Sequence, residues 1–288
     1  MELIHFQGLN CYHDCIVTLA NNMGLNYTDS FSRLWSEADF RYDTICNVFL
    51  TRRMPEYLEK KGMKLNAPCI SQAEKESGWA DTEYGEFIII GMDAFLIPWN
   101  PLYKIHHGPH YFIVKRENEE WQICFDPTYG LCNMKYSSDF LIEDSYAVIP
   151  VKRTEFKEEP QKYSISVYDE AAEVIKNHKE LLDYFCTQSD LWICDDEDTE
   201  LLPAKLADAM LTGRYLYRYF LQTNNVKLDI PVLFYNEKYY KQWVAVKNGF
   251  FKAALNQTNR TAYNEACDLL SDIMEKEILF ARQIIQQK

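Results

Sequence analysis

The strongest constraint on the fold is a change in apolar pattern near residue 151. Before it, short apolar runs bounded by turn residues predict strands at 87–92, 110–115, 120–125 and 146–150, preceded by helices at 11–23 and 54–62. Beyond a charged linker at 152–164, apolar residues recur every three to four positions, at 168–184, 203–222, 239–256 and 260–286. The sequence therefore predicts an α+β fold with two domains: residues 1–151, a helix plus an antiparallel sheet, and residues 165–288, mainly helical.

The last predicted helix carries an amphipathic stripe. Its members recur at spacings of three to four and include one charged residue: Leu269, Ile273, Glu277, Phe280 and Ile284. Such a stripe packs either within the chain or on a second copy of it, which leaves a homodimer open.

Composition limits the classes of partner. The 288 residues carry a formal charge of −13 and no basic stripe, so a nucleic-acid partner is not expected. The acidity fits a cationic small-molecule partner, or serves solubility alone. Nine cysteines occur without a CxxC pair, and no apolar run approaches the roughly 18 residues of a membrane span. We therefore expect a cytoplasmic protein with reduced thiols, no membrane partner, and neither a metal nor a cofactor.

Cys11 is the first candidate catalytic residue. It begins an apolar helix that ends at Gly24, so its thiol faces the positive end of the helix dipole. That position favours the nucleophilic thiolate.

Two further residues complete a candidate triad. His110 begins one strand of a predicted hairpin, and Asp126 ends the other strand. In an antiparallel pair the start of one strand lies beside the end of its neighbour, so the two side chains can meet. A carboxylate there would orient the imidazole and stabilise the imidazolium. The order Cys11, His110, Asp126 is the layout of a papain-like nucleophilic site.

The neighbours of Cys11 are expected to play lesser roles. Cys15 falls in the apolar stripe of the helix and is predicted to be a core thiol. His13 and Asp14 are expected to cap the helix or to face water. Gln7 is a candidate donor to an oxyanion hole, although the backbone N–H of Cys11 is the stronger one.

Three histidines leave a second interpretation open. His106, His107 and His110 lie close together, but their spacing lacks the i, i+4 pair of a helical metal site. The sequence favours the triad over a metal centre here.

Several segments resemble the BtrH-type proteins of butirosin biosynthesis. The resemblance runs through Gly8-Leu9-Asn10-Cys11 and its helix, Asp93-Ala94-Phe95-Leu96-Ile97-Pro98-Trp99, His110-Tyr111-Phe112-Ile113-Val114, Asp126-Pro127 and the helical half with Arg214-Tyr215-Leu216-Tyr217. Bacteriocin-processing cysteine peptidases share the Cys-helix-Gly and His…Asp-Pro patterns. The sequence departs from the family at Asn10, where a histidine is expected.

The resemblance implies an acyltransferase of antibiotic biosynthesis with a papain-like N-terminal domain. An acyl or aminoacyl group would pass from the phosphopantetheine thioester of an acyl carrier protein to Cys11, and then to an amine of an aminoglycoside or peptide-like acceptor. Asp93, or the acidic run Asp195, Asp196 and Glu197, would line the site of that acceptor.

Two other functions are weighed against acyl transfer. A cysteine peptidase or amidase would use the same triad with water. A binding protein on a papain-like scaffold would need no triad, so the three residues in order count against it. The helical half suggests a second substrate or partner surface, which favours transfer over hydrolysis.

Overall fold

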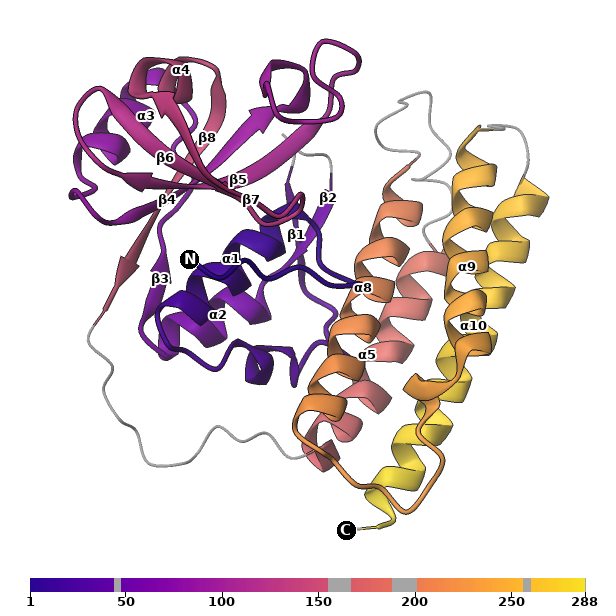
Figure 1. Ribbon diagram of the computed structural model, residues 1–288. Coiled ribbons are helices and arrows are strands. Elements are labelled where there is room, and N and C mark those ends of the chain that lie inside the picture. The colour runs from indigo at the N-terminus through magenta and orange to yellow at the C-terminus, as the bar shows by residue number, and fades with distance from the viewer. Residues whose placement is uncertain (44–47, 155–166, 188–200, 256–259, 288) are drawn as a thin grey trace. The chain divides into compact units, whose positions relative to one another are not determined.

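The computed structural model describes residues 1–43, 48–154, 167–187, 201–255 and 260–287. The chain divides into two compact units (Figure 1). Unit 1 comprises Met1–Tyr27 and Pro55–Glu158, and unit 2 comprises Thr28–Met54 and Glu159–Lys288. As predicted, the fold is mixed α and β, with an N-terminal helix and antiparallel sheets followed by a mainly helical C-terminal region.

The division differs from the contiguous domains 1–151 and 165–288 expected from the sequence. Residues 28–54 group with the helical unit rather than with the N-terminal unit. The reason is a long-range contact, because the buried Trp35 donates a hydrogen bond from Nε1 to Glu277, 242 residues away. The predicted linker lies mostly outside the described residues, as does the acidic run 195–197.

A six-stranded antiparallel sheet forms the centre of unit 1. Its order is β3 (Met63–Leu65), β8 (Ser145–Arg153), β4 (Phe87–Asp93), β5 (Pro109–Arg116), β6 (Trp121–Asp126) and β7 (Leu131–Ser137). The predicted hairpin is present as β5 and β6, with Ile113 opposite Phe125 and Arg116 opposite Gln122. The chain order of His110 and Asp126 thus becomes a spatial pairing at one end of this hairpin.

Helices cover both faces of this sheet. Trp79 of α3 (Gln72–Ala80) and Leu141 of α4 (Ser138–Glu143) share a buried cluster with Ile88, Ile90, Phe112 and Val114. Alternate residues point to the other face, where Tyr111 packs on Tyr12 of α1 (Cys11–Asn22), with ring centroids 5.1 Å apart. Burial on both faces explains why β4 is an almost unbroken apolar run. A further helix, α2, spans Arg53–Lys60.

Unit 2 is built on four long helices, α5 (Val167–Thr187), α8 (Leu202–Thr223), α9 (Glu237–Leu255) and α10 (Arg260–Ile285). Their bounds agree with the predicted stretches to within a few residues. A short antiparallel pair, β1 (Phe40–Asp43) and β2 (Val48–Thr51), joins them. The described residues also form three short 3-10 turns: η1 (Tyr27–Phe31), η2 (Ala94–Leu96) and η3 (Leu233–Tyr235).

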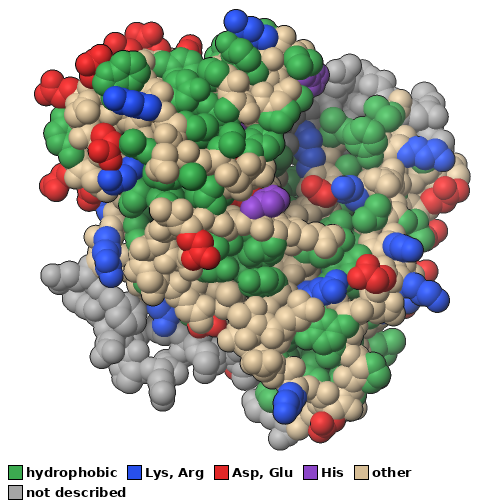
Figure 2. Space-filling model, viewed as in Figure 1, with side chains coloured by type: hydrophobic (Ala, Val, Ile, Leu, Met, Phe, Trp, Pro, Cys, Tyr) green, Lys and Arg blue, Asp and Glu red, His purple; other side chains and the backbone are tan. Residues whose placement is uncertain are grey.

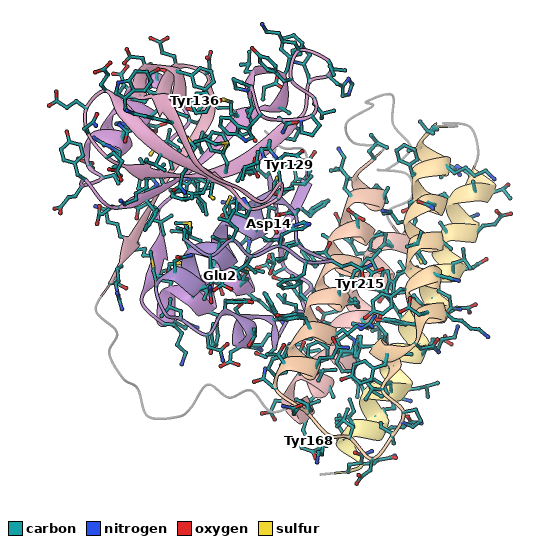
Figure 3. All side chains as sticks on the ribbon, in the orientation of Figure 1. Glu2, Asp14, Tyr129, Tyr136, Tyr168 and Tyr215 are labelled. Carbon is teal, nitrogen blue, oxygen red and sulfur yellow. The ribbon has the colours of Figure 1, made fainter. Side chains whose placement is uncertain are left out.

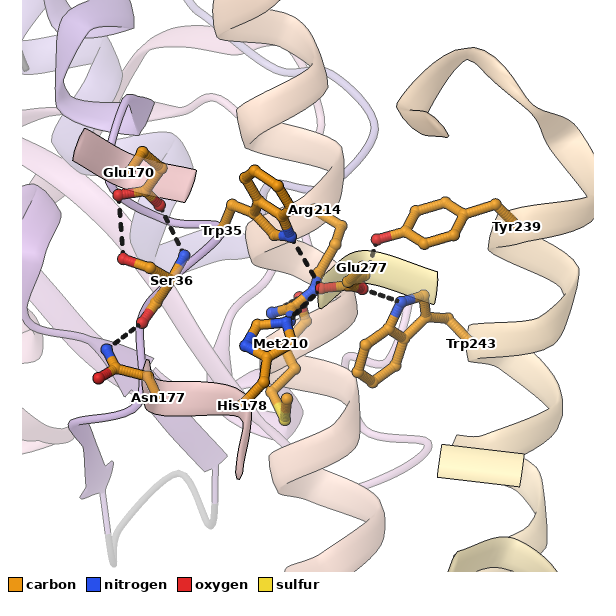
Figure 4. A network of polar contacts seen from close by, with 10 residues as sticks. All are labelled: Trp35, Ser36, Glu170, Asn177, His178, Met210, Arg214, Tyr239, Trp243 and Glu277. Atoms are coloured by element: carbon orange, nitrogen blue, oxygen red, sulfur yellow. Dashed lines mark hydrogen bonds and ion pairs between the residues drawn. The ribbon is translucent and has the colours of Figure 1, made fainter. Parts of the chain in front are cut away.

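The carboxylate of Glu277 collects an unusual number of hydrogen bonds in the core of unit 2 (Figure 4). Glu277 of α10 is fully buried, and both of its oxygens accept hydrogen bonds. Five side chains donate at 2.5–3.0 Å: Trp35, His178, Arg214, Tyr239 and Trp243. Burial alone would raise the pKa of Glu277, but the charges and hydrogen bonds of Arg214 and His178 outweigh it and lower that pKa.

The surface carries charges of both signs. On the face drawn in Figure 2, Lys and Arg side chains stand singly among acidic and apolar ones instead of forming a stripe. Among the described helices, none combines the length and apolarity needed to span a bilayer.

Candidate active site

Cys11 occupies the first turn of α1, as predicted. Asn10 is the N-cap: its backbone is extended, and its side-chain oxygen accepts a hydrogen bond from the backbone N–H of His13 at 2.9 Å. Asparagine is among the best N-cap residues, which gives Asn10 a structural role at the position where the family resemblance expects histidine. The Cys11 side chain is half-buried, so the thiol lies at the helix end that favours a thiolate while retaining access to solvent.

His110 and Asp126 meet at one end of the β5–β6 hairpin. His110 Nε2 lies 2.7 Å from Asp126 Oδ2, and both side chains are buried. Trp99 donates from Nε1 to the same oxygen at 2.8 Å. The other oxygen, Asp126 Oδ1, has no hydrogen-bond partner within the described parts of the chain. Asp126 thus holds the imidazole at a defined angle while keeping one oxygen unused.

The electrostatics link His110 to Cys11 as well. Burial by itself lowers the pKa of His110, but hydrogen bonds with Asp126 and Cys11 and the charges of both outweigh it and raise that pKa to about 9. The imidazolium form is therefore favoured at neutral pH, next to the thiol. The structure thus bonds His110 to Asp126 and brings Cys11 close enough to act on the pKa of the imidazole.

Two other residues near Cys11 in sequence, Cys15 and Gln7, differ in burial. Cys15 is fully buried, as predicted, and burial raises the pKa of its thiol well above the usual range, with the charges of Cys11, Asp126 and Asp14 adding to the effect. Gln7 is exposed in the turn that precedes α1, and its role in an oxyanion hole stays a prediction.

The expectation that His13 and Asp14 cap the helix or face water is wrong. Asn10 provides the cap, and both residues are buried. Burial lowers the pKa of His13 to about 4, and neither ring nitrogen has a partner among the residues that the structure describes. Asp14 accepts hydrogen bonds from Thr128 and His5. Both partners lie outside the helix of Asp14, so the helical pattern could not have indicated them.

Sequence reasoning also missed Tyr129. Its ring centroid lies 5.3 Å from that of His110 and the side chain is 39% exposed, so it offers an aromatic surface beside His110 that solvent reaches. Burial raises the pKa of its hydroxyl, as does the charge of Asp126. The sequence feature that could have pointed to Tyr129 was its position, three residues after Asp126 in the turn that ends at Gly130.

Two of the three histidines that suggested a metal centre contact different carboxylates. His110 contacts Asp126, whereas His107 Nδ1 lies 2.6 Å from Asp93 Oδ2 and its ring stacks on Phe95. Asp93 also accepts hydrogen bonds from the backbone of Phe95 and Gly108. Asp93 therefore organises the loop before β5, with its oxygens already engaged.

Figure 3 labels Asp14 on α1, the helix that also carries Cys11, and Tyr129 in the turn after β6. The arrangement offers a nucleophile, a base and an orienting carboxylate, beside an exposed aromatic ring. No model of a protein family matches the chain, and a search of curated proteins finds no match to it either.

Proposed function

We propose that this chain is a papain-like acyltransferase of antibiotic biosynthesis, acting in the cytoplasm, in which Cys11 carries the acyl group. The observation that supports the proposal most strongly is the hydrogen bond of His110 with Asp126, in a site where Cys11, at the start of a helix, also raises the pKa of His110. That constellation serves nucleophilic acyl transfer.

The reaction has two halves. In the first, His110 holds the proton of the Cys11 thiol, and the thiolate attacks the carbonyl carbon of a carrier-bound thioester. The tetrahedral intermediate collapses, the carrier thiolate leaves, and it takes the proton from His110. The product is an acyl thioester on Cys11.

In the second half, an amine of the acceptor attacks the acyl carbon on Cys11. His110 accepts the proton that the amine loses, and the thiolate of Cys11 leaves, forming the amide. Asp126 keeps the imidazole in place through both halves. Exchange of a thioester for an amide needs no further energy source.

The test is acylation of Cys11 observed by intact mass. The probes are an acyl N-acetylcysteamine thioester, which carries the end of a phosphopantetheine arm, and the same acyl group on an acyl carrier protein. We expect one acyl adduct, located on Cys11 by peptide mapping and absent from Cys11→Ala. Cys132→Ala is the matched control, because Cys132 is an exposed thiol on β7 outside the site, and this variant should be acylated like the wild type.

The second half is tested by adding an amino sugar to the acylated protein. Transfer predicts an amide product whose yield rises with amine concentration. Release of free acid at every amine concentration would instead identify the hydrolase, and an adduct that survives in Cys11→Ala would refute the nucleophile.

A further inference from the structure

Asp14 is a buried carboxylate that bonds to side chains outside its own helix. It stands three residues after Cys11 on α1, with its side chain fully buried. Thr128 Oγ1 donates to Asp14 Oδ2 at 2.6 Å, and His5 Nδ1 lies 3.0 Å from Oδ1 and 2.9 Å from Oδ2. The helix of the nucleophile is thereby attached to two other segments of unit 1.

Thr128 belongs to the turn between Asp126, the residue of the candidate site that ends β6, and Leu131, which begins β7. The turn follows Asp126, includes Tyr129, and closes through a backbone hydrogen bond from Gly130 to Pro127 at 3.2 Å. The pairing of β6 with β7 shifts register between Cys124 and Asp126 and resumes at Asp126 opposite Leu131, directly before the turn. The Thr128 side chain therefore ties this irregular end of the hairpin to α1.

The charged groups near the Asp14–Thr128 hydrogen bond include residues of the candidate site. Burial raises the pKa of Asp14, while Thr128 and His5 lower it and the charge of Asp126 adds to the increase. The groups that face Asp14 are thus His5, Thr128 and Asp126, together with Cys15 on its own helix. The groups that face Cys11 are His110, Tyr129 and Cys15.

We propose that Asp14 is a positioning residue: through Thr128 it sets the place of Asp126 and Tyr129 relative to α1, and hence the place of His110 relative to Cys11. The inference rests on the proposed function in one respect, that Cys11 is the nucleophile. Asp14 itself touches none of the reacting atoms.

The test measures alkylation of Cys11 by iodoacetamide from pH 5 to pH 10, followed on the Cys11 peptide by mass spectrometry. This readout needs no acyl substrate. Thr128→Val removes the hydroxyl at nearly constant volume, Thr128→Ser retains it, and Asp14→Asn removes the charge. Thr18→Val is the matched control, because Thr18 is a buried threonine of the same helix whose hydroxyl bonds to Ile4, away from the site.

We expect Thr128→Val and Asp14→Asn to move the alkylation midpoint upward by about one pH unit, since a displaced imidazolium stabilises the thiolate less. At pH values below both midpoints the rate then falls about tenfold, while the rate at pH values above both midpoints stays at the wild-type value. Thr128→Ser and Thr18→Val keep the wild-type profile. Should Asp14→Asn fail to fold, comparison of the alkylation profiles of Thr128→Val and Thr128→Ser still tests the positioning role.

Two results would overturn the proposal: an equal fall in rate at every pH, or the same shift in Thr18→Val as in Thr128→Val. Failure of the proposed function is a separate outcome. If no thioester acylates Cys11 but the alkylation profile shifts as expected, the positioning role stands and the acyltransferase does not.

Discussion

Asp126 and Glu277 are both fully buried carboxylates, and they differ in how completely their oxygens are bonded. Both oxygens of Glu277 accept hydrogen bonds, from five side chains in all. Asp126 accepts two hydrogen bonds on one oxygen, while its other oxygen has no partner among the described residues. A saturated carboxylate holds a core together, whereas an under-bonded one beside a histidine and a half-buried thiol marks a place for chemistry.

The comparison predicts first that Glu277→Gln destabilises the protein without changing the site. The substitution leaves the buried Arg214 without its counter-charge, which costs about 3–5 kcal/mol of the free energy of unfolding. Urea titration measures this loss. Below the unfolding transition, alkylation of Cys11 should proceed at the wild-type rate, and a slowed alkylation in the folded variant would contradict the division of roles.

The second prediction is that His110, the partner of Asp126, and Glu277 give opposite pH signatures. The pKa of His110 is raised from 6.5 to about 9 in the folded state, so its contribution is complete below about pH 6.5 and is lost as pH rises through 9. The pKa of Glu277 is lowered, so its contribution is complete above its unfolded value of 4.5 and is lost as pH falls below it.

The His110 contribution is at most about 3 kcal/mol for a shift of this size. It is measured as the difference in unfolding free energy between wild type and His110→Gln across pH 6–10, because titrating groups common to both proteins cancel in that difference. The wild type minus Glu277→Gln difference should shrink only in acid. A His110 difference that stays constant from pH 6 to pH 10 would show that the imidazole is not held as described.

The smallest effect on stability is expected for Asp126→Asn, which makes the same chemical change as Glu277→Gln at the other carboxylate. The amide oxygen can still accept from Trp99, so the loss of unfolding free energy should not exceed the contribution of the raised His110 pKa, at most about 3 kcal/mol. Loss of the charge that supports the imidazolium should lower the rate of Cys11 acylation about 10²-fold at neutral pH. An unfolding free energy that falls as far as in Glu277→Gln would remove the contrast between the two residues.

Much of unit 1 could be predicted from the sequence because its signals are local. The apolar runs of β4, β5 and β6 and the helix ending at Gly24 follow from periodicity and turn residues. The meeting of His110 with Asp126 follows from the geometry of a hairpin. Strand β7 carries no comparable signal, since Leu131–Ser137 alternates only weakly and is largely exposed or half-buried.

What escaped prediction depends on contacts between distant segments. The position of Asp14 in the first turn of a helix suggests a solvated residue, but Thr128, 114 residues later, provides its partner. Glu277 is the one charge on an apolar stripe, yet its five donors come from four other parts of the chain (Figure 4). Buried polar residues are specified by partners that local patterns do not encode.

The segment 28–54 has a consequence for how the protein is made. Trp35 leaves the ribosome early, yet the carboxylate that accepts its hydrogen bond is 242 residues further along the chain. At about 5–20 residues per second, synthesis of that interval takes roughly 12–48 s. During this interval unit 1 can complete its sheet. The side chains of Trp35 and Phe31 stay exposed until the helices that bury them have been synthesised. A chaperone that binds short aromatic stretches of nascent chains would find its target here, in a segment whose own unit is still being synthesised.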